Sequence, residues 1–211
     1  MEKEASAEYI KTKIIDFLID RNSDLILGNE VMYGTKRKLV DLLMLDTSNL
    51  IGIEIKSSTD DLRRLNKQIE EYNKIFNYTI ICSTNKHFSE LQNIIPKEVG
   101  LMLFTKDRIE LKRKPILRKR LDKKEILYTI PSSFLRKEYK IKNNSANSDE
   151  VRSLLLKLPH SQLQVLLYRY FREKLYGNFK MFSNIKGEQC HIDDIPLLSL
   201  KSTKIDMGNI F

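Results

Sequence analysis

The segments KLVDLLML (38–45), DTSN (46–49) and LIGIEIK (50–56) together predict a β-hairpin at the centre of the fold. The first segment is apolar enough for a buried strand and is interrupted by one carboxylate, Asp41. The second has the composition of a turn. The third alternates with a period of two, which places Ile51, Ile53 and Ile55 on one face and Gly52, Glu54 and Lys56 on the other.

The register of this hairpin brings two acidic side chains together. If Leu45 pairs with Leu50 across the four-residue turn, Asp41 lies opposite Glu54, and Lys56 lies on the same face as Glu54. Cross-strand partners stand about 4.5–5.5 Å apart, so the two carboxylates repel each other unless a cation lies between them. Mg²⁺ suits oxygen ligands of this kind, and an adjacent ammonium can orient a water and offset charge on a phosphate.

The pattern acid-x-Lys occurs four times in the chain, beginning at Glu54, Glu110, Asp122 and Glu138. Only the triplet at Glu54 follows an Asp-bearing strand in hairpin register and precedes a predicted helix start. The nearest acid upstream of Glu110 is only three residues away and cannot face it from another strand. This context favours Glu54 and Lys56 as a functional pair.

The flanking segments predict an α/β fold in which helices cover a mixed sheet. Apolar spacing predicts a helix over 6–21 and another over about 58–76, the latter opening with Ser58-Thr59-Asp60-Asp61. The remaining predicted elements are strands over 78–83, 99–105 and 109–112 and helices over 87–95, 131–139 and 149–175, with a polar break at 143–148. We therefore expect a core over 1–112, a basic connecting segment over 113–145 and a mainly helical C-terminal region over 146–211.

The positive charge of the chain is concentrated in that connecting segment. The net charge is +9, and residues 113–145 hold 11 Lys and Arg against three Asp and Glu. A block of this kind is typical of a surface that binds a polyanion, most simply nucleic acid, although a solvated basic linker explains the charge equally well. The candidate nucleic-acid contacts are Arg64, Arg113, Lys114, Arg118, Lys119, Arg120, Lys123 and Lys124.

Arg64, Gln68 and Tyr72 form one line along the helix that follows Lys56, because they are spaced by four residues. Two interpretations are open on periodicity alone. The line could overlook the acidic pair and hold a phosphate or a metal-bound water, or Tyr72 could belong to the core while Gln68 and Arg64 lie on the surface.

Asp41, Glu54-Ile55-Lys56 and Gln68-x-x-x-Tyr72 together resemble the PD-(D/E)xK nuclease superfamily, and the last motif is typical of its RecB-like members. The run from Glu54 to Ser57, followed by Asp60-x-Leu62-x-Arg64-Leu65, resembles a bacterial and phage branch of that superfamily. The resemblance covers roughly residues 6–112. It implies a restriction-endonuclease-like αβββαβ core that hydrolyses phosphodiester bonds with a bound metal.

The resemblance also implies roles for single residues. Asp41, Glu54 and Lys56 would form the catalytic set, and Asp41, Glu54 and the Ile55 carbonyl would hold the metal. Gln68 and Tyr72 would be supporting residues. Many members add an acid from the first helix, for which Glu8 is the candidate here, with Glu30 a second one in the following loop.

The sequence thus predicts a Mg²⁺-dependent nuclease, with Mn²⁺ as a substitute, that acts on DNA as an endonuclease. The alternative is a catalytically silent nucleic-acid-binding or regulatory protein on the same fold, and a weaker one is a protein whose basic block binds an acidic partner. A homodimer or a protein partner would use the C-terminal region. Without a signal peptide or an apolar span we expect a cytoplasmic protein that contacts no membrane. Cys82 and Cys190 are too isolated for a disulfide scaffold or a zinc site.

Overall fold

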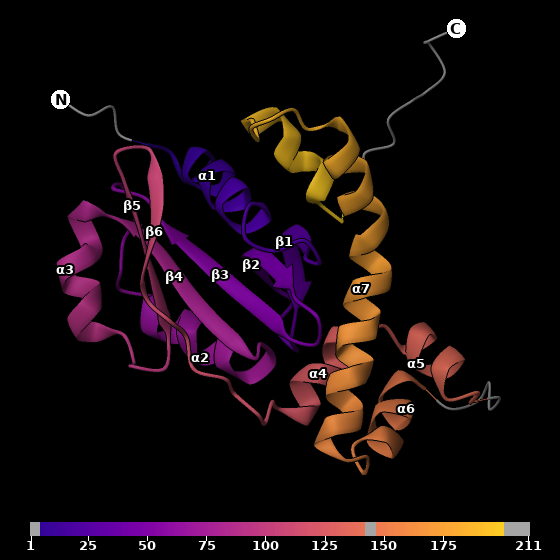
Figure 1. Cartoon of the computed structure of the whole chain (residues 1–211). Coiled ribbons are helices and arrows are strands. Elements are labelled where there is room, and N and C mark those ends of the chain that lie inside the picture. The colour runs from indigo at the N-terminus through magenta and orange to yellow at the C-terminus, as the bar shows by residue number, and fades with distance from the viewer. Residues whose placement is uncertain (1–4, 142–146, 201–211) are drawn as a thin grey trace, which may run out of the picture.

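The computed structural model describes residues 5–141 and 147–200 and has a six-stranded mixed sheet at its centre (Figure 1). The strands lie in the order of the sequence, and β3, β4 and β5 run parallel while the other neighbours are antiparallel. The strands are β1 (Ile26–Tyr33), β2 (Lys38–Leu45), β3 (Leu50–Lys56), β4 (Tyr78–Thr84), β5 (Gly100–Thr105) and β6 (Arg108–Arg113). The α/β class with a mixed sheet is confirmed.

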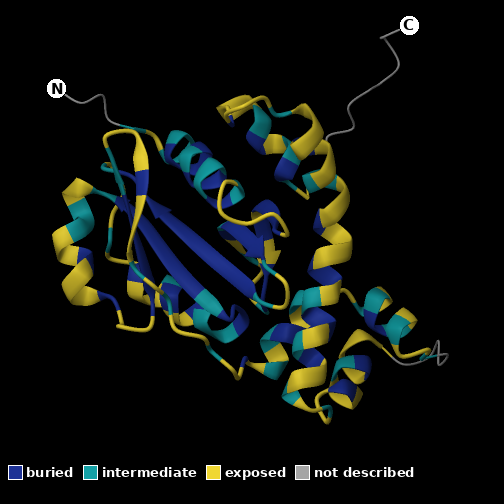
Figure 2. Cartoon of the chain, in the orientation of Figure 1, coloured by how far each residue is buried: buried dark blue, intermediate teal, exposed yellow. Residues whose placement is uncertain are grey.

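Helices cover both faces of the sheet. On one face α1 (Ala7–Ile19) packs Ile10, Ile14 and Leu18 against apolar side chains that include Ile53 and Ile55 of β3. On the other face lie α2 (Leu65–Ile75) and α3 (Asn85–Ile94). Figure 2 shows that the central strands are buried throughout while the helices are exposed along their outer sides.

The C-terminal part of the chain is helical and packs against the β1 edge of the sheet. Its elements are α4 (Lys123–Thr129), α5 (Ser132–Glu138), α6 (Ser148–Leu155), α7 (His160–Ile185) and the 3₁₀ helix η1 (Ile192–Leu198). The long helix α7 runs from α5 and α6 to η1 beside α1 (Figure 1), and its Phe171 and Leu175 share one core with Val31 of β1. Among the helices of residues 5–141 and 147–200, none has the length and apolar composition that crossing a membrane requires.

The predicted hairpin is confirmed, including its register. The strands begin and end where the sequence predicts, and Leu45 pairs with Leu50. The sequence pattern did not reveal β1, because Asn29 and the exposed Glu30 interrupt its apolar residues.

Two helix predictions were wrong in their bounds. The helix after β3 begins at Leu65 and not at Ser58, because the Asp60 carboxylate accepts hydrogen bonds from the Ser57 amide and hydroxyl and holds 57–60 as a turn. The segment 149–175 contains two helices because Pro159, whose backbone carries no N–H, separates α6 from α7.

Gly52 lets α2 lie close to the sheet. It occupies the same face of β3 as Glu54, and a Cβ atom at this position would lie 2.4 Å from the ring of Phe76 at the end of α2. The Phe76 ring is fully buried and contacts the rings of Tyr33 and Tyr72, so it cannot move aside freely. The small side chain of Gly52 therefore sets the height of α2 above Glu54.

We expect Gly52→Ala to lower the free energy of unfolding by about 1–3 kcal/mol, since the added methyl group overpacks a closed core. Urea denaturation measures the change. Gly177→Ala in α7 is the matched control: nothing lies within 4 Å of its Cβ position, and the substitution should stabilise the helix by up to about 1 kcal/mol. Equal stability of Gly52→Ala and the parent protein would contradict the close packing.

Candidate functional site

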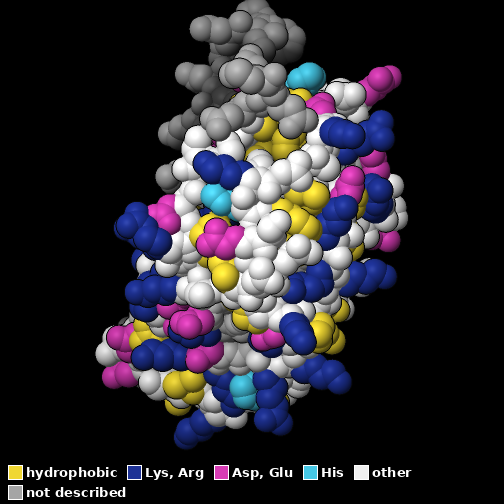
Figure 3. Space-filling view, turned by 90° about the vertical axis from the view of Figure 1, so that its left-hand side faces the viewer, with side chains coloured by type: hydrophobic (Ala, Val, Ile, Leu, Met, Phe, Trp, Pro, Cys, Tyr) yellow, Lys and Arg dark blue, Asp and Glu magenta, His cyan; other side chains and the backbone are white. Residues whose placement is uncertain are grey.

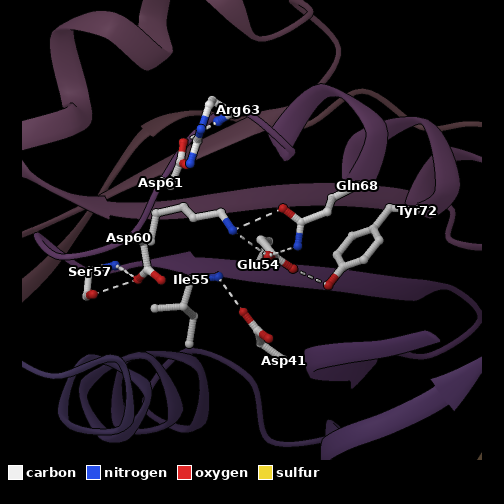
Figure 4. A network of polar contacts seen from close by, with 10 residues as sticks. Asp41, Glu54, Ile55, Ser57, Asp60, Asp61, Arg63, Gln68 and Tyr72 are labelled. Carbon is white, nitrogen blue, oxygen red and sulfur yellow. Dashed lines mark hydrogen bonds and ion pairs between the residues drawn. The ribbon is translucent and has the colours of Figure 1, made fainter.

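Strands β2 and β3 diverge at the point where the acidic residues lie. They pair with each other as far as Leu42 and Ile53, after which β2 continues beside β1 and β3 continues beside β4. In the resulting fork the Asp41 carboxylate accepts a hydrogen bond from the Ile55 amide, with 2.8 Å between Oδ2 and N (Figure 4). The carboxylate thus takes the place of a neighbouring strand for Ile55.

A change in the alternation of side chains accompanies this fork. Leu42 packs in the core under α1, whereas Val40, two residues away, packs in the core under α2. Residues two apart in a regular strand share a face, so the alternation shifts by one position at Asp41. The same shift occurs on β1 at Glu30, which has the left-handed backbone angle φ of 48°. Asp41 therefore belongs to neither face and points along the sheet.

The Glu54 carboxylate is held by three donors (Figure 4). Its Oε1 accepts hydrogen bonds from Lys56 Nζ at 2.8 Å and from Gln68 Nε2, and its Oε2 accepts one from the Tyr72 hydroxyl. Lys56 Nζ also donates to Gln68 Oε1 at 3.0 Å. Glu54 and Lys56 are only 3% and 7% exposed, which makes this a buried ion pair.

This geometry decides between the two interpretations of the line along α2. Gln68 and Tyr72 face Glu54 and contact it, as the family resemblance implies. Arg64 lies at the N-terminal end of α2, exposed to solvent.

The two carboxylates perturb each other electrostatically. Burial, together with repulsion from Glu54, raises the pKa of Asp41 to about 7, although the Ile55 amide and the charges of Lys11 and Lys56 oppose the rise. Burial and the same two carboxylates raise the pKa of Tyr72 well above its usual value, so its hydroxyl stays protonated and donates to Glu54. Negative charge accumulates here, and a cation would stabilise it.

Glu8 and Glu30 stand at different distances from this cluster. The half-exposed Glu8 carboxylate binds Lys11 Nζ at 3.1 Å, and Lys11 also donates to Asn29 Oδ1 at 2.8 Å. The charge of Lys11 lowers the pKa of Asp41, so Glu8 reaches the site through Lys11. Glu30 is exposed.

Lys11 was missed by the sequence analysis. Its side chain is 3% exposed and lies among the apolar residues of α1. A signal was available, because Lys11 precedes Ile14 and Ile15 at the three- and four-residue spacing that defines the buried stripe.

The basic connecting segment lies at the other end of the strands. Arg113 donates to the carbonyls of Val99 and Pro96, and Arg118 donates to the carbonyl of Phe76, all near the amino ends of β4 and β5. Lys56 ends β3, six residue steps from Leu50, which is roughly 20 Å of strand. Lys123 donates to the Leu156 carbonyl. The exposed members of the segment are Lys114, Lys119, Arg120 and Lys124.

Asp41 and Glu54 are the two carboxylates of the cluster, and within residues 5–141 and 147–200 no three His, Cys, Asp or Glu side chains form a group that could hold a metal. The Ile55 carbonyl is a further oxygen at this position. Because the N–H and C=O of one strand residue point to the same side, this carbonyl lies on the Asp41 side of β3.

Comparison with known proteins gives one solved structure and one family. A protein of unknown function from Silicibacter pomeroyi is 16% identical, with a TM-score of 0.46, over 70% of this chain and 98% of that chain. Protein cII of Enterobacteria phage P4 is 24% identical over 202 residues, which cover 90% of this chain and 76% of the phage protein. The family model described as bacteriophage P4 protein cII matches residues 1–199. The chain therefore belongs to the bacteriophage P4 cII protein family.

Proposed function

We propose that this protein is a divalent-metal-dependent nuclease that acts on DNA, with Asp41, Glu54 and Lys56 as its catalytic set. The observation that carries the proposal is the convergence of these three charged groups where β2 and β3 diverge. Each is held by other residues of the chain: Asp41 by the Ile55 amide, Glu54 by Tyr72, and Lys56 by Gln68 and Glu54.

The donor set fits a hard divalent cation. Asp41, Glu54 and the Ile55 carbonyl would hold it through oxygen atoms, which both Mg²⁺ and Mn²⁺ accept. The raised pKa of Asp41 reflects negative charge that the protein does not fully offset, and a bound cation would offset it. When bound, the ion would supply Lewis-acid polarisation of the phosphate and a more acidic water.

The protein residues supply positioning and charge. Lys56 Nζ carries the protons that would be donated to a phosphate oxygen or to the attacking water. Gln68 and Glu54 fix that ammonium from two sides, at 3.0 and 2.8 Å. Tyr72 holds the far oxygen of Glu54, so the carboxylate keeps one orientation before substrate binds.

One observation favours the alternative of a catalytically silent nucleic-acid-binding protein. Both oxygens of Glu54 already accept hydrogen bonds within the protein, so a metal would compete with Gln68, Lys56 or Tyr72. In this alternative the cluster is a structural polar network. Binding of DNA without product in Mg²⁺ or Mn²⁺ would support it.

We expect Asp41→Asn, Glu54→Gln and Lys56→Met each to lower the rate of DNA cleavage by about 100-fold or more, since each removes a charge at the reacting phosphate. The assay uses circular, linear and single-stranded DNA and RNA with Mg²⁺, Mn²⁺ or EDTA. Circular dichroism and urea denaturation report whether the variants fold.

The chain offers a matched control for this experiment. Glu110 and Lys112 have the same acid-x-Lys spacing and also form an ion pair, but they lie half-exposed on the edge strand β6. Glu110→Gln and Lys112→Met should leave cleavage unchanged. Full activity of all three site variants would reject the assignment.

Metal binding should depend on pH through Asp41. Since the pKa of Asp41 is about 7 in the folded protein and 3.8 in a model peptide, the folded state binds this proton more tightly. The Asp41 contribution to stability therefore falls as pH rises from about 4 to about 7. A cation competes with the same proton, so Mg²⁺ should stabilise the protein more at about pH 8 than at about pH 5.5.

Thermal unfolding with and without MgCl₂ at the two pH values measures this effect. At a Mg²⁺ concentration about ten times Kd, the gain is about 1.4 kcal/mol. Asp41→Asn should reduce the gain at the higher pH and remove its pH dependence. An equal gain at both pH values, in the parent protein and in Asp41→Asn, would place the cation elsewhere.

A further inference from the structure

A cavity of about 820 Å³ opens at the carboxyl ends of β4 and β5. Its walls come from the start of α1, the loop after β3, the start of α3 and the β5–β6 turn. The side chains that bear on its chemistry are Tyr9, Thr84, Lys86, Phe104 and Lys106, and Ser58 lines it as well.

The cavity adjoins the candidate site across the ends of the strands. Lys56 pairs with Ser83, and Thr84, the next residue, lines the cavity. Ser58 lies two residues beyond Lys56, and Lys86 Nζ donates to its carbonyl at 2.6 Å. Lys56 faces α2, whereas the cavity lies on the side of α1. A strand that passes over this edge of the sheet would therefore meet both.

The polar groups of the cavity await a partner of specific chemistry. The Thr84 hydroxyl is buried and has no hydrogen-bond partner among the residues that the structure describes, although a buried hydroxyl normally has one. Thr84 is also the N-cap residue of α3, and its side chain makes no capping hydrogen bond. The hydroxyl is thus available to a ligand.

The rest of the lining suits an aromatic anion. The rings of Tyr9 and Phe104 meet edge to face at 6.2 Å, and Lys86 and Lys106 are exposed. Asp107 is the one acidic residue of the lining. The Tyr9 hydroxyl at 2.6 Å and Lys13 Nζ at 3.2 Å bind its carboxylate and offset its charge. Figure 3 shows Lys and Arg side chains distributed over the face of the molecule that carries α3, with Asp and Glu between them.

We propose that this cavity binds one nucleotide of the substrate strand, adjacent to the phosphodiester at Asp41 and Glu54. The identity of the strand rests on the proposed function. The base contacts Tyr9 and Phe104, the phosphate contacts Lys86 and Lys106, and the Thr84 hydroxyl binds a polar atom of the nucleotide. The volume lies within the range of about 300–1,000 Å³ that is usual for small-ligand sites.

Thr84→Val tests the hydroxyl, because valine keeps the shape and removes only the polar group. Without a ligand this hydroxyl contributes nothing to folding, so the variant should be as stable as the parent protein or more stable. Its affinity for a fluorescein-labelled single-stranded oligodeoxynucleotide, measured by anisotropy in EDTA, should fall about 3- to 10-fold.

Lys86→Gln combined with Lys106→Gln tests the phosphate contacts. The double variant should bind the same oligonucleotide about tenfold more weakly and reduce the dependence of binding on salt by one to two phosphate contacts, about 0.7 in slope for each. Lys97→Gln is the matched control: Lys97 is equally exposed but follows the far end of α3. Its affinity should not change.

The outcomes separate this inference from the proposed function. If both cavity variants bind like the parent protein, or the parent protein does not bind the oligonucleotide, the nucleotide site is rejected. Cleavage by the parent protein in Mg²⁺ would still support the nuclease in the first case. If the cavity variants lose affinity as expected but no variant or parent protein yields product, the nucleotide site stands and hydrolysis is rejected.

Discussion

The hydrogen bond from the Ile55 amide to the Asp41 carboxylate marks the constraint on which the site depends. Where β2 and β3 separate, a buried backbone N–H loses its strand partner, and leaving it unpaired would cost about 1–3 kcal/mol. A carboxylate that enters the fork satisfies the amide, but it brings a charge into a region of low polarity beside Glu54. The pKa of Asp41 rises accordingly. The divergence of two strands thus creates both a backbone need and a site of unbalanced negative charge.

The elements around the fork compensate Glu54 more completely than Asp41. Gly52 allows Phe76 to approach the sheet, and α2 then lies low enough for Gln68 and Tyr72 to reach Glu54. The turn held by Asp60 delays the start of α2 until Leu65. With the Lys56 ammonium, Glu54 has three donors, whereas Asp41 has one backbone donor and feels Lys11 only at longer range. This asymmetry explains why Asp41 is the carboxylate whose pKa approaches neutrality.

The sequence predicted what local periodicity determines and missed what tertiary packing determines. The register of the hairpin follows from a period of two and a four-residue turn, so the shared face of Glu54 and Lys56 was predicted correctly. Strand β1 was not recognised, because its alternation changes at Glu30, where the backbone enters the left-handed region. The start of α2 was misplaced, since the same Ser and Asp residues cap helices and close turns. No sequence pattern could show that Arg113 and Arg118 bind backbone carbonyls about 20 Å of strand away from Lys56, because that separation follows from strand order.

Buried ion pairs contribute little net stability, and replacing them with apolar residues of similar volume is often neutral or favourable. Stability alone therefore gives no reason to place Asp41, Glu54 and Lys56 in the interior when the surrounding positions hold isoleucine and leucine. The decoy triplet at Glu110 makes the same point from the other side: an acid and a lysine with the same spacing form their ion pair at the surface, where desolvation is small. The cost of burying charge in the fork is understandable if the site serves a ligand that completes it, and a divalent cation is the ligand whose charge and oxygen preference match the groups present.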